Sequence, residues 1–298
     1  MKKIVVFLIF CFSIGICSAQ DWMTDLEVAE RLALVQNKLL VVAWEGSYFD
    51  GIPMYINNDK GEEVFVKNLF DVPVVDSLLW AHFIPVILKE SEHSRLYENI
   101  KNKRSTAYLE KFHDDSVKVM DANGNILNVN DEGYLFNVSR FIDKYSMNMT
   151  MLNEKLTNYK RKKDFYSAFF LSASYMDFAF YSRGSVRPEL VDLASIYLDE
   201  ASEFLDQENF ENKEVLMQRV NLMEIQKDLL LERPKKVLRK LNRIKEDQVE
   251  PVNSSLRSFL YFSSYKMLQD HESAAEWQSK VTSIDIKKVM QLINSLQE

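Results

Sequence analysis

Apolar residues run without a break through positions 39–43, and the polar or small residues Gly46, Ser47, Asp50 and Gly51 follow soon after. A short continuous apolar run that ends at such residues is typical of a buried strand leading into a loop. Upstream, positions 21–36 carry apolar residues at helical spacing. The pattern therefore predicts a helix, a central strand and then an exposed loop, where a functional site would lie.

Further elements are predicted between residues 57 and 145. The polar cluster 57–61 predicts a turn, and residues 74–88 predict a short helix that runs into a second strand. Residues 95–112 predict a helix, and residues 116–127 predict a β-hairpin closed by an Asn-Gly turn. Residues 134–145 have helical spacing and predict a closing helix.

The pattern changes after Met149, because strand signals almost disappear and Gly184 is the only glycine. Prolines that lie near helix starts, where they are tolerated, help to divide this half into helices. The predicted helices lie near 150–162, 165–182, 188–206, 212–232, 234–247, 252–269, 271–282 and 284–296. Short connections between them favour antiparallel helical hairpins, and aromatic and small residues in 165–180 and 256–281 resemble tetratricopeptide helix pairs.

The first half resembles the thioredoxin-like family. In that family a Lys precedes the apolar central strand and an aromatic follows it, as Lys38 and Trp44 do in this sequence. The two positions that match the family's redox cysteines are Phe49 and Ile52, and Asp115 occupies the position of its cis-proline. Thiol–disulfide exchange needs an attacking thiolate, so no oxidoreductase activity of this kind is expected.

The resemblance implies an α/β thioredoxin-like domain over residues 20–147, with a central mixed sheet flanked by helices. An all-α, tetratricopeptide-like array of helical hairpins is expected over residues 148–298. Because the residue at 115 is not proline, a trans peptide bond is expected before it.

Residues 1–19 have the form of a secretory signal peptide. Lys2 and Lys3 precede an apolar run over residues 4–16 that is too short to cross a membrane, and cleavage is expected after Ala19. Both cysteines, Cys11 and Cys17, lie in this segment, so the exported chain would contain no thiol. We expect export to the periplasm or the cell surface, with no membrane span after cleavage.

Loss of the two lysines changes the formal net charge from −7 to −9. Such a charge argues against nucleic acid as a partner, and it also argues against an anionic membrane. The low counts of glycine, 7, and proline, 6, fit a chain that is mostly helical. No cofactor is expected, since no phosphate-binding glycine loop and no metal motif is present.

Two loops that face each other in the thioredoxin-like family would bring together the polar residues of the first half. The residues proposed for binding there are Tyr48, Asp50, His113 and Asp114. With Asp115, this set could alternatively hold a metal or act as acid and base. Phe49 and Ile52 are expected to fill the space left by the lost cysteines, with an exposed binding patch as the alternative.

Three other motifs each have two interpretations. Asp121, Asn123 and Asn125 begin like a calcium loop, but a hairpin turn explains them more simply, since Ile126 stands where that loop requires glycine. The basic run 160–163 could contact an acidic partner, although a solvated helix end is favoured. The aromatic cluster in 165–181 is expected to be mostly core, with part of it free to line a partner groove.

Two functions from different classes follow from this sequence. The favoured hypothesis is an exported, non-catalytic thioredoxin-like protein that binds or assembles with a protein of the cell envelope. The alternative is an enzyme or metal-binding protein that uses Asp50, His113, Asp114 and Asp115 at the former redox site.

Overall fold

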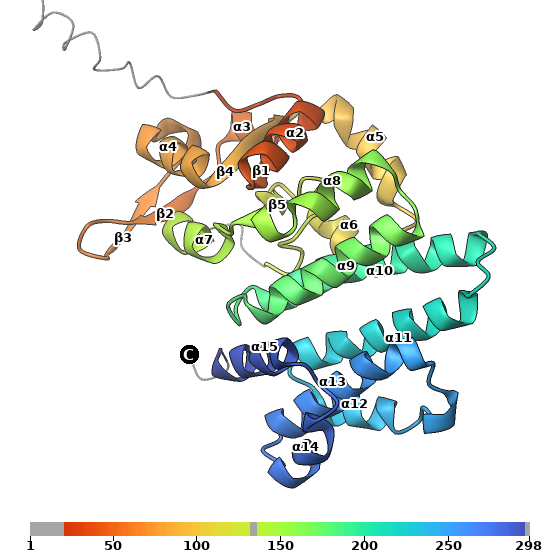
Figure 1. Ribbon diagram of the computed structural model, residues 1–298. Helices are drawn as coiled ribbons and strands as arrows, with labels where there is room; N and C mark the ends of the chain where they lie inside the picture. Colours follow the sequence, from red (N-terminus) through yellow and green to blue (C-terminus); the bar gives the residue numbers. More distant parts are fainter. Residues whose placement is uncertain (1–20, 132–135, 296–298) are drawn as a thin grey trace, which may run out of the picture.

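The computed structural model describes residues 21–131 and 136–295. The expected signal peptide, its cleavage site and both cysteines lie outside the described residues. The chain forms a small mixed sheet near the N-terminus, followed by many helices (Figure 1).

The central strand of the main sheet is β1 (Leu39–Trp44), as the apolar run predicted. It pairs in parallel with β4 (Phe83–Leu88) and antiparallel with β5 (Lys118–Met120). All six residues of β1 are buried, which explains why its sequence is apolar without alternation.

Single bridges extend this sheet at both edges. Met23 pairs in parallel with Val86 of β4, and Ile126 pairs antiparallel with Met120 of β5. The chain order across the sheet is therefore Met23, β4, β1, β5 and Ile126, with the first three parallel.

Successive side chains of β1 point to opposite faces of the sheet, and since all of them are apolar, both faces are covered by helices. Leu40 and Val42 share a core with residues of α2 (Leu26–Gln36) and α6 (Thr106–His113). Leu39, Val41 and Ala43 belong to a second core with residues of α4 (Pro73–His82) and α7 (Val138–Tyr145).

The structure corrects the expected loop after β1 and confirms the turn expected at 57–61. The strand leads directly into a short helix, α3 (Glu45–Asp50), and Gly51 ends it with a φ of 81°. The turn at 57–61 closes an unpredicted hairpin of β2 (Met54–Asn57) and β3 (Glu63–Val66). β2 also pairs in parallel with β6 (Phe136–Asn137), so β3 lies at the edge of a second small sheet (Figure 1).

Two further expectations need correction. The helix expected over 95–112 is divided into α5 (Glu90–Ile100) and α6, where the Ser105 hydroxyl caps α6 by accepting from the Tyr108 N–H. The helix expected over 134–145 begins only at Val138 in α7, after strand β6, and residues 134–135 lie outside the described residues.

The helices of the second half agree closely with the predicted ranges. The main difference is that the helix expected over 234–247 already ends at Leu241. The observed helices are α8 (Asn153–Arg161), α9 (Phe165–Phe180), α10 (Arg187–Gln207), α11 (Lys213–Leu230), α12 (Pro234–Leu241), α13 (Ser254–Met267), α14 (His271–Gln278) and α15 (Ser283–Asn294). Short 3-10 turns lie at Leu69–Asp71, Met149–Met151, Glu246–Gln248 and Pro251–Asn253.

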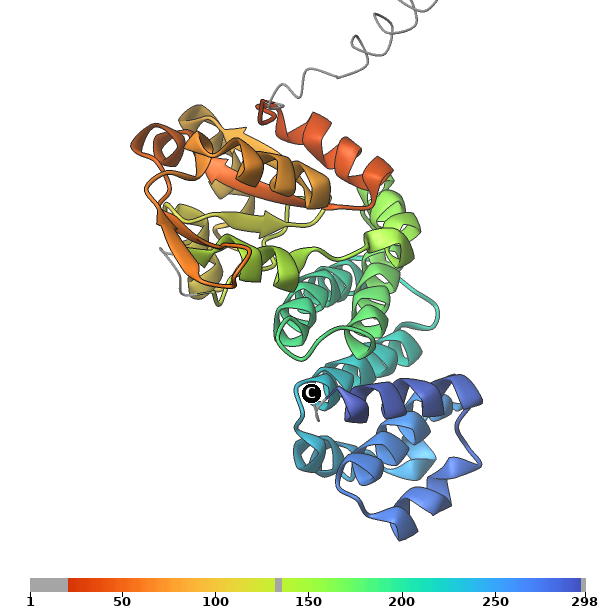
Figure 2. The same ribbon diagram turned by 90° about the vertical axis from the view of Figure 1, so that its left-hand side faces the viewer.

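Helices α8, α9 and α10 lie between the sheet and the last helices, as both views show (Figures 1 and 2). The turn after β5 contacts this layer, since the Asp121 carboxylate accepts hydrogen bonds from the hydroxyls of Tyr175 and Tyr197. The Tyr145 hydroxyl donates to Glu189 at 3.0 Å. One apolar core also includes residues of both halves.

In residues 21–131 and 136–295, no helix combines the length and the apolar character that crossing a membrane requires.

Candidate functional site

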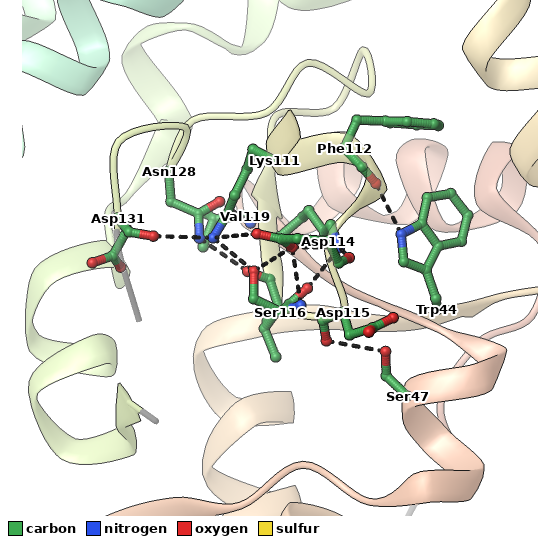
Figure 3. A network of polar contacts seen from close by, with 12 residues as sticks. Trp44, Ser47, Lys111, Phe112, Asp114, Asp115, Ser116, Val119, Asn128 and Asp131 are labelled. Atoms are coloured by element: carbon green, nitrogen blue, oxygen red, sulfur yellow. Dashed lines mark hydrogen bonds and ion pairs between the residues drawn. The ribbon is translucent and has the colours of Figure 1, made fainter. Parts of the chain in front are cut away.

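The loops that follow β1 and precede β5 face each other. The Ser47 hydroxyl, in α3, donates a hydrogen bond to the backbone carbonyl of Asp115 at 3.0 Å (Figure 3). The peptide bond before Asp115 is trans, as expected from the absence of proline. The sequence therefore placed these two segments together correctly, although the first of them is a helix.

Phe49 and Ile52 have different environments. Ile52 is 5 % exposed and belongs to the core, so the expectation that it fills space is confirmed. For Phe49 that expectation is wrong, because its side chain is 75 % exposed in the last turn of α3. The matching cysteine in the family would begin a helix, which Phe49 does not.

Tyr48, Phe49 and Phe70 form a surface cluster that we call the aromatic patch. The Tyr48 ring lies 4.6 Å from the Phe70 ring and 5.6 Å from the Phe49 ring, both in edge-to-face arrangements. Tyr48 is 40 % exposed and Phe70 is half-buried, with its other side against the buried Trp22 at 5.0 Å. The patch thus rests on the buried Trp22 and has one mostly exposed ring, Phe49.

The space between the two loops is very small. A hollow of about 30 Å³ is lined by Ser47, Asp50, Ile52 and Asp115, together with Gly51 and Pro53. This volume accommodates one or two water molecules, whereas sites for organic ligands usually measure hundreds of Å³. The facing loops therefore offer a surface and not a substrate cavity.

The polar residues proposed for this site do not converge on one point. Asp114 accepts a hydrogen bond from the hydroxyl of its neighbour Ser116, whereas the His113 ring contacts His93 of α5. The side chains of Asp50 and Asp115 are exposed. Within the described residues, no hydrogen bond or ion pair joins any two side chains of this set.

An ion pair in the loop before β5 joins Asp114 to Lys118, whose side chain is fully buried in β5. The Lys118 Nζ lies 3.0 Å from the Asp114 Oδ1, donates to the Ser116 carbonyl at 2.8 Å and also donates to the Asp114 carbonyl. Burial is the main cause that lowers the pKa of Lys118 to about 8, against the attraction of Asp114. The sequence did not single out this residue.

A second lysine supports the same loop. Lys111 in α6 is also buried, and its Nζ donates to the Ser116 hydroxyl at 2.7 Å and to the Asp131 carbonyl at 3.2 Å (Figure 3). The Asn128 side chain completes the network, accepting from the Val119 N–H and donating to the Val117 carbonyl. The donor groups of Lys111, Lys118 and Asn128 are thus bonded to acceptors within the protein. The network holds the loop before β5 in place and presents no free reactive group.

Sequence analysis also missed a histidine pair. His113 Nδ1 lies 3.0 Å from His93 Nε2, and the His93 ring packs 4.8 Å from Trp44. Burial, followed by the neighbouring His113, lowers the pKa of His93. No group of three or more His, Cys, Asp or Glu side chains suited to a metal occurs among the described residues.

Other motifs have structural roles. The Asp121 carboxylate accepts from the N–H groups of Asn123 and Asn125, so these residues form a turn. In the aromatic cluster of 165–181, most rings are at least partly buried, but Tyr166, Phe170 and Tyr181 are exposed.

Comparison of the chain with protein-family models, with curated proteins and with solved structures gave no match.

Proposed function

We propose that this protein is an exported, non-catalytic, thioredoxin-like module that binds a protein of the cell envelope through the aromatic patch. Three features support the thioredoxin-like assignment: the mixed sheet has β1 at its centre, helices cover both faces, and the loop before β5 contacts α3. The resemblance read from Lys38 and Trp44 implies each of them.

The observation that carries the proposal is the exposure of Phe49 beside Tyr48 where the family has its redox site. Aromatic side chains on a rigid base are frequent anchors of protein interfaces, since they bury much area and lose little conformational freedom. The small hollow beside them does not favour a small substrate. A partner protein with a pocket for the exposed Phe49 ring fits these features best.

The surroundings of the patch are acidic. Asp50 follows Phe49, Asp71 follows Phe70, and both carboxylates are exposed, as is that of Asp115. Charged residues at the rim of an interface mainly affect the association rate and its dependence on salt. We therefore infer a partner with an apolar pocket surrounded by basic residues.

The test is cross-linking of the mature chain in envelope extracts, followed by binding measurements with the purified partner. Phe49→Ala should weaken binding by about tenfold or more, as expected for an interface anchor. Because Phe49 is mostly exposed, this variant should change the free energy of unfolding by about 0.5 kcal/mol or less.

Tyr181→Ala is the matched control, since Tyr181 is also an exposed aromatic residue but lies at the end of α9. Binding that weakens equally in both variants would reject the aromatic patch as the interface. Reduction of insulin disulfides by the purified mature chain would reject the non-catalytic assignment.

A further inference from the structure

A second hollow lies away from the aromatic patch, where the sheet meets the helical half. Its volume is about 480 Å³, within the range usual for sites that bind small organic molecules. Its walls come from α2, from α5 and α6, from the turn after β5, and from α8 and α10. No residue of the aromatic patch contributes to it.

One part of this cavity is apolar. The side chains of α5 and α6 that line it include Leu96, Ile100, Tyr108 and Phe112. Met120 of β5 and Leu26 of α2 complete this part of the wall. A ligand with an apolar body could therefore replace water at these surfaces, which is favourable in proportion to the apolar area covered.

The acidic groups that line the cavity all have cationic partners. Glu200 lies 2.7 Å from Arg104 and also accepts from the Tyr159 hydroxyl. Glu30 forms an ion pair with Lys160, and Glu98 lies 2.6 Å from Lys101. Although the chain is acidic overall, the carboxylates of this cavity are neutralised.

Two lysines that line the cavity have no acidic partner. Lys103 and Lys163 are both exposed, and no carboxylate of the described residues lies within 4 Å of either ammonium group. Lys163 lies over the ring of Tyr159, with its Nζ 5.2 Å from the centroid. The cavity therefore has two free positive charges at its rim.

Arg104 provides a second, independent indication of an anionic ligand. Its side chain is only 9 % exposed, and one terminal nitrogen donates to Glu200 and to the Asn125 amide oxygen. Its Nε–H is buried and has no acceptor. Buried donors without acceptors are rare, because the lost hydrogen bond to water is not replaced.

We propose that this cavity binds a small organic anion with an apolar or aromatic body, such as an aryl or alkyl carboxylate or sulfonate. The anionic group lies near Arg104, between Lys103 and Lys163, and the body lies against Ile100, Tyr108 and their neighbours. This inference does not depend on the protein partner proposed above.

The probes are 1-anilinonaphthalene-8-sulfonate, which combines an aromatic body with one negative charge, and its neutral analogue N-phenyl-1-naphthylamine. Titration calorimetry and fluorescence with the folded mature chain should show one saturable site for the anion. The double variant Lys103→Glu, Lys163→Glu should weaken binding of the anion by about tenfold while changing that of the neutral dye less than twofold. Lys60→Glu is the control for charge reversal, since Lys60 is exposed in the turn between β2 and β3 and does not line the cavity.

Ile100→Asp should weaken binding of both dyes, since it places a charge in the apolar wall. Phe49→Ala should leave both unchanged, which separates this site from the aromatic patch. The proposal is overturned if the anion shows no saturable binding, or if the double variant weakens the two dyes equally.

Discussion

Asp121 provides the sharpest test of how the two halves are joined. Its carboxylate is fully buried and accepts four hydrogen bonds. Two come from backbone N–H groups of its own turn, at 2.9 and 3.0 Å, and two come from the hydroxyls of Tyr175 and Tyr197 in α9 and α10. Replacing this side chain removes the acceptor that both halves share.

The expected loss can be worked from these contacts. A hydrogen bond to a charged acceptor contributes about 1.5–3 kcal/mol, and a buried donor left without an acceptor costs about 1–3 kcal/mol. Tyr197 also accepts from the Asn125 amide at 3.0 Å, whereas Asp121 is the only partner found for the Tyr175 hydroxyl in the described residues. Allowing for relief of the buried charge, Asp121→Ala should lower the free energy of unfolding by about 3–4 kcal/mol.

Asp121→Asn should cost less, about 1–2 kcal/mol, because the amide oxygen can still accept from the turn. Burial raises the pKa of Asp121 above its ordinary value of 3.8. Between pH 3.8 and the raised pKa, the folded state binds more protons than the unfolded state. The contribution of Asp121 to the free energy of unfolding therefore falls as the pH rises through this range. The Asn variant should lack that part of the pH dependence.

The assay is urea unfolding of the purified protein, monitored by tryptophan fluorescence and by circular dichroism. Combining Asp121→Ala with Tyr175→Phe should give a loss clearly smaller than the sum of the single losses, since both changes remove one contact. The reasoning is refuted if Asp121→Ala changes stability by less than about 0.5 kcal/mol, or if the two losses simply add.

Two other predictions concern the sheet and its turn. The free energy of unfolding of the unsubstituted protein should rise between pH 8 and 10.5, because the folded state loses the Lys118 proton at a lower pH than the unfolded state does. This rise is at most about 3 kcal/mol, and Lys118→Met should abolish it. Urea midpoints across this range measure it, and an unchanged slope would contradict it. Gly124→Ala should cost about 1–2 kcal/mol, since φ is 78° and the new methyl group would lie 3.0 Å from the Glu30 carboxylate. Gly61→Ala, at φ 79° with no atom within 4 Å, should cost less, so equal losses would show that the Glu30 contact is unimportant.

The sequence predicted elements well where one physical signal dominated. The strand at 39–44 follows from its continuous apolar run, and the helices after residue 149 follow from helical spacing with prolines near their starts. The hairpin of β2 and β3 was missed because each strand has only four residues and its pairing depends on the turn between them. Residues 45–50 were expected to form a loop, since glycine and serine there favour irregular structure, but they form one short helix.

The candidate site was predicted only as a neighbourhood. The resemblance placed the segment around Ser47 beside Asp115, yet it could not show that Phe49 points to solvent while Ile52 is buried. Lys118 was overlooked because a lysine in a short strand is ordinarily at the surface, and its burial depends on Asp114 and on carbonyl groups of the folded loop. The pair of His93 and His113 is separated by 20 residues, so no local motif indicates it.

The unpaired edge of β3 affects how copies of this protein behave at high concentration. A free strand edge offers N–H and C=O groups to a neighbouring molecule and can begin self-association. This strand has only four residues, and Glu62, Glu63 and Lys67 place charges at both of its ends. Short length and charged ends are features that disfavour pairing between edge strands, and they matter here because Phe65 in the middle of β3 is exposed.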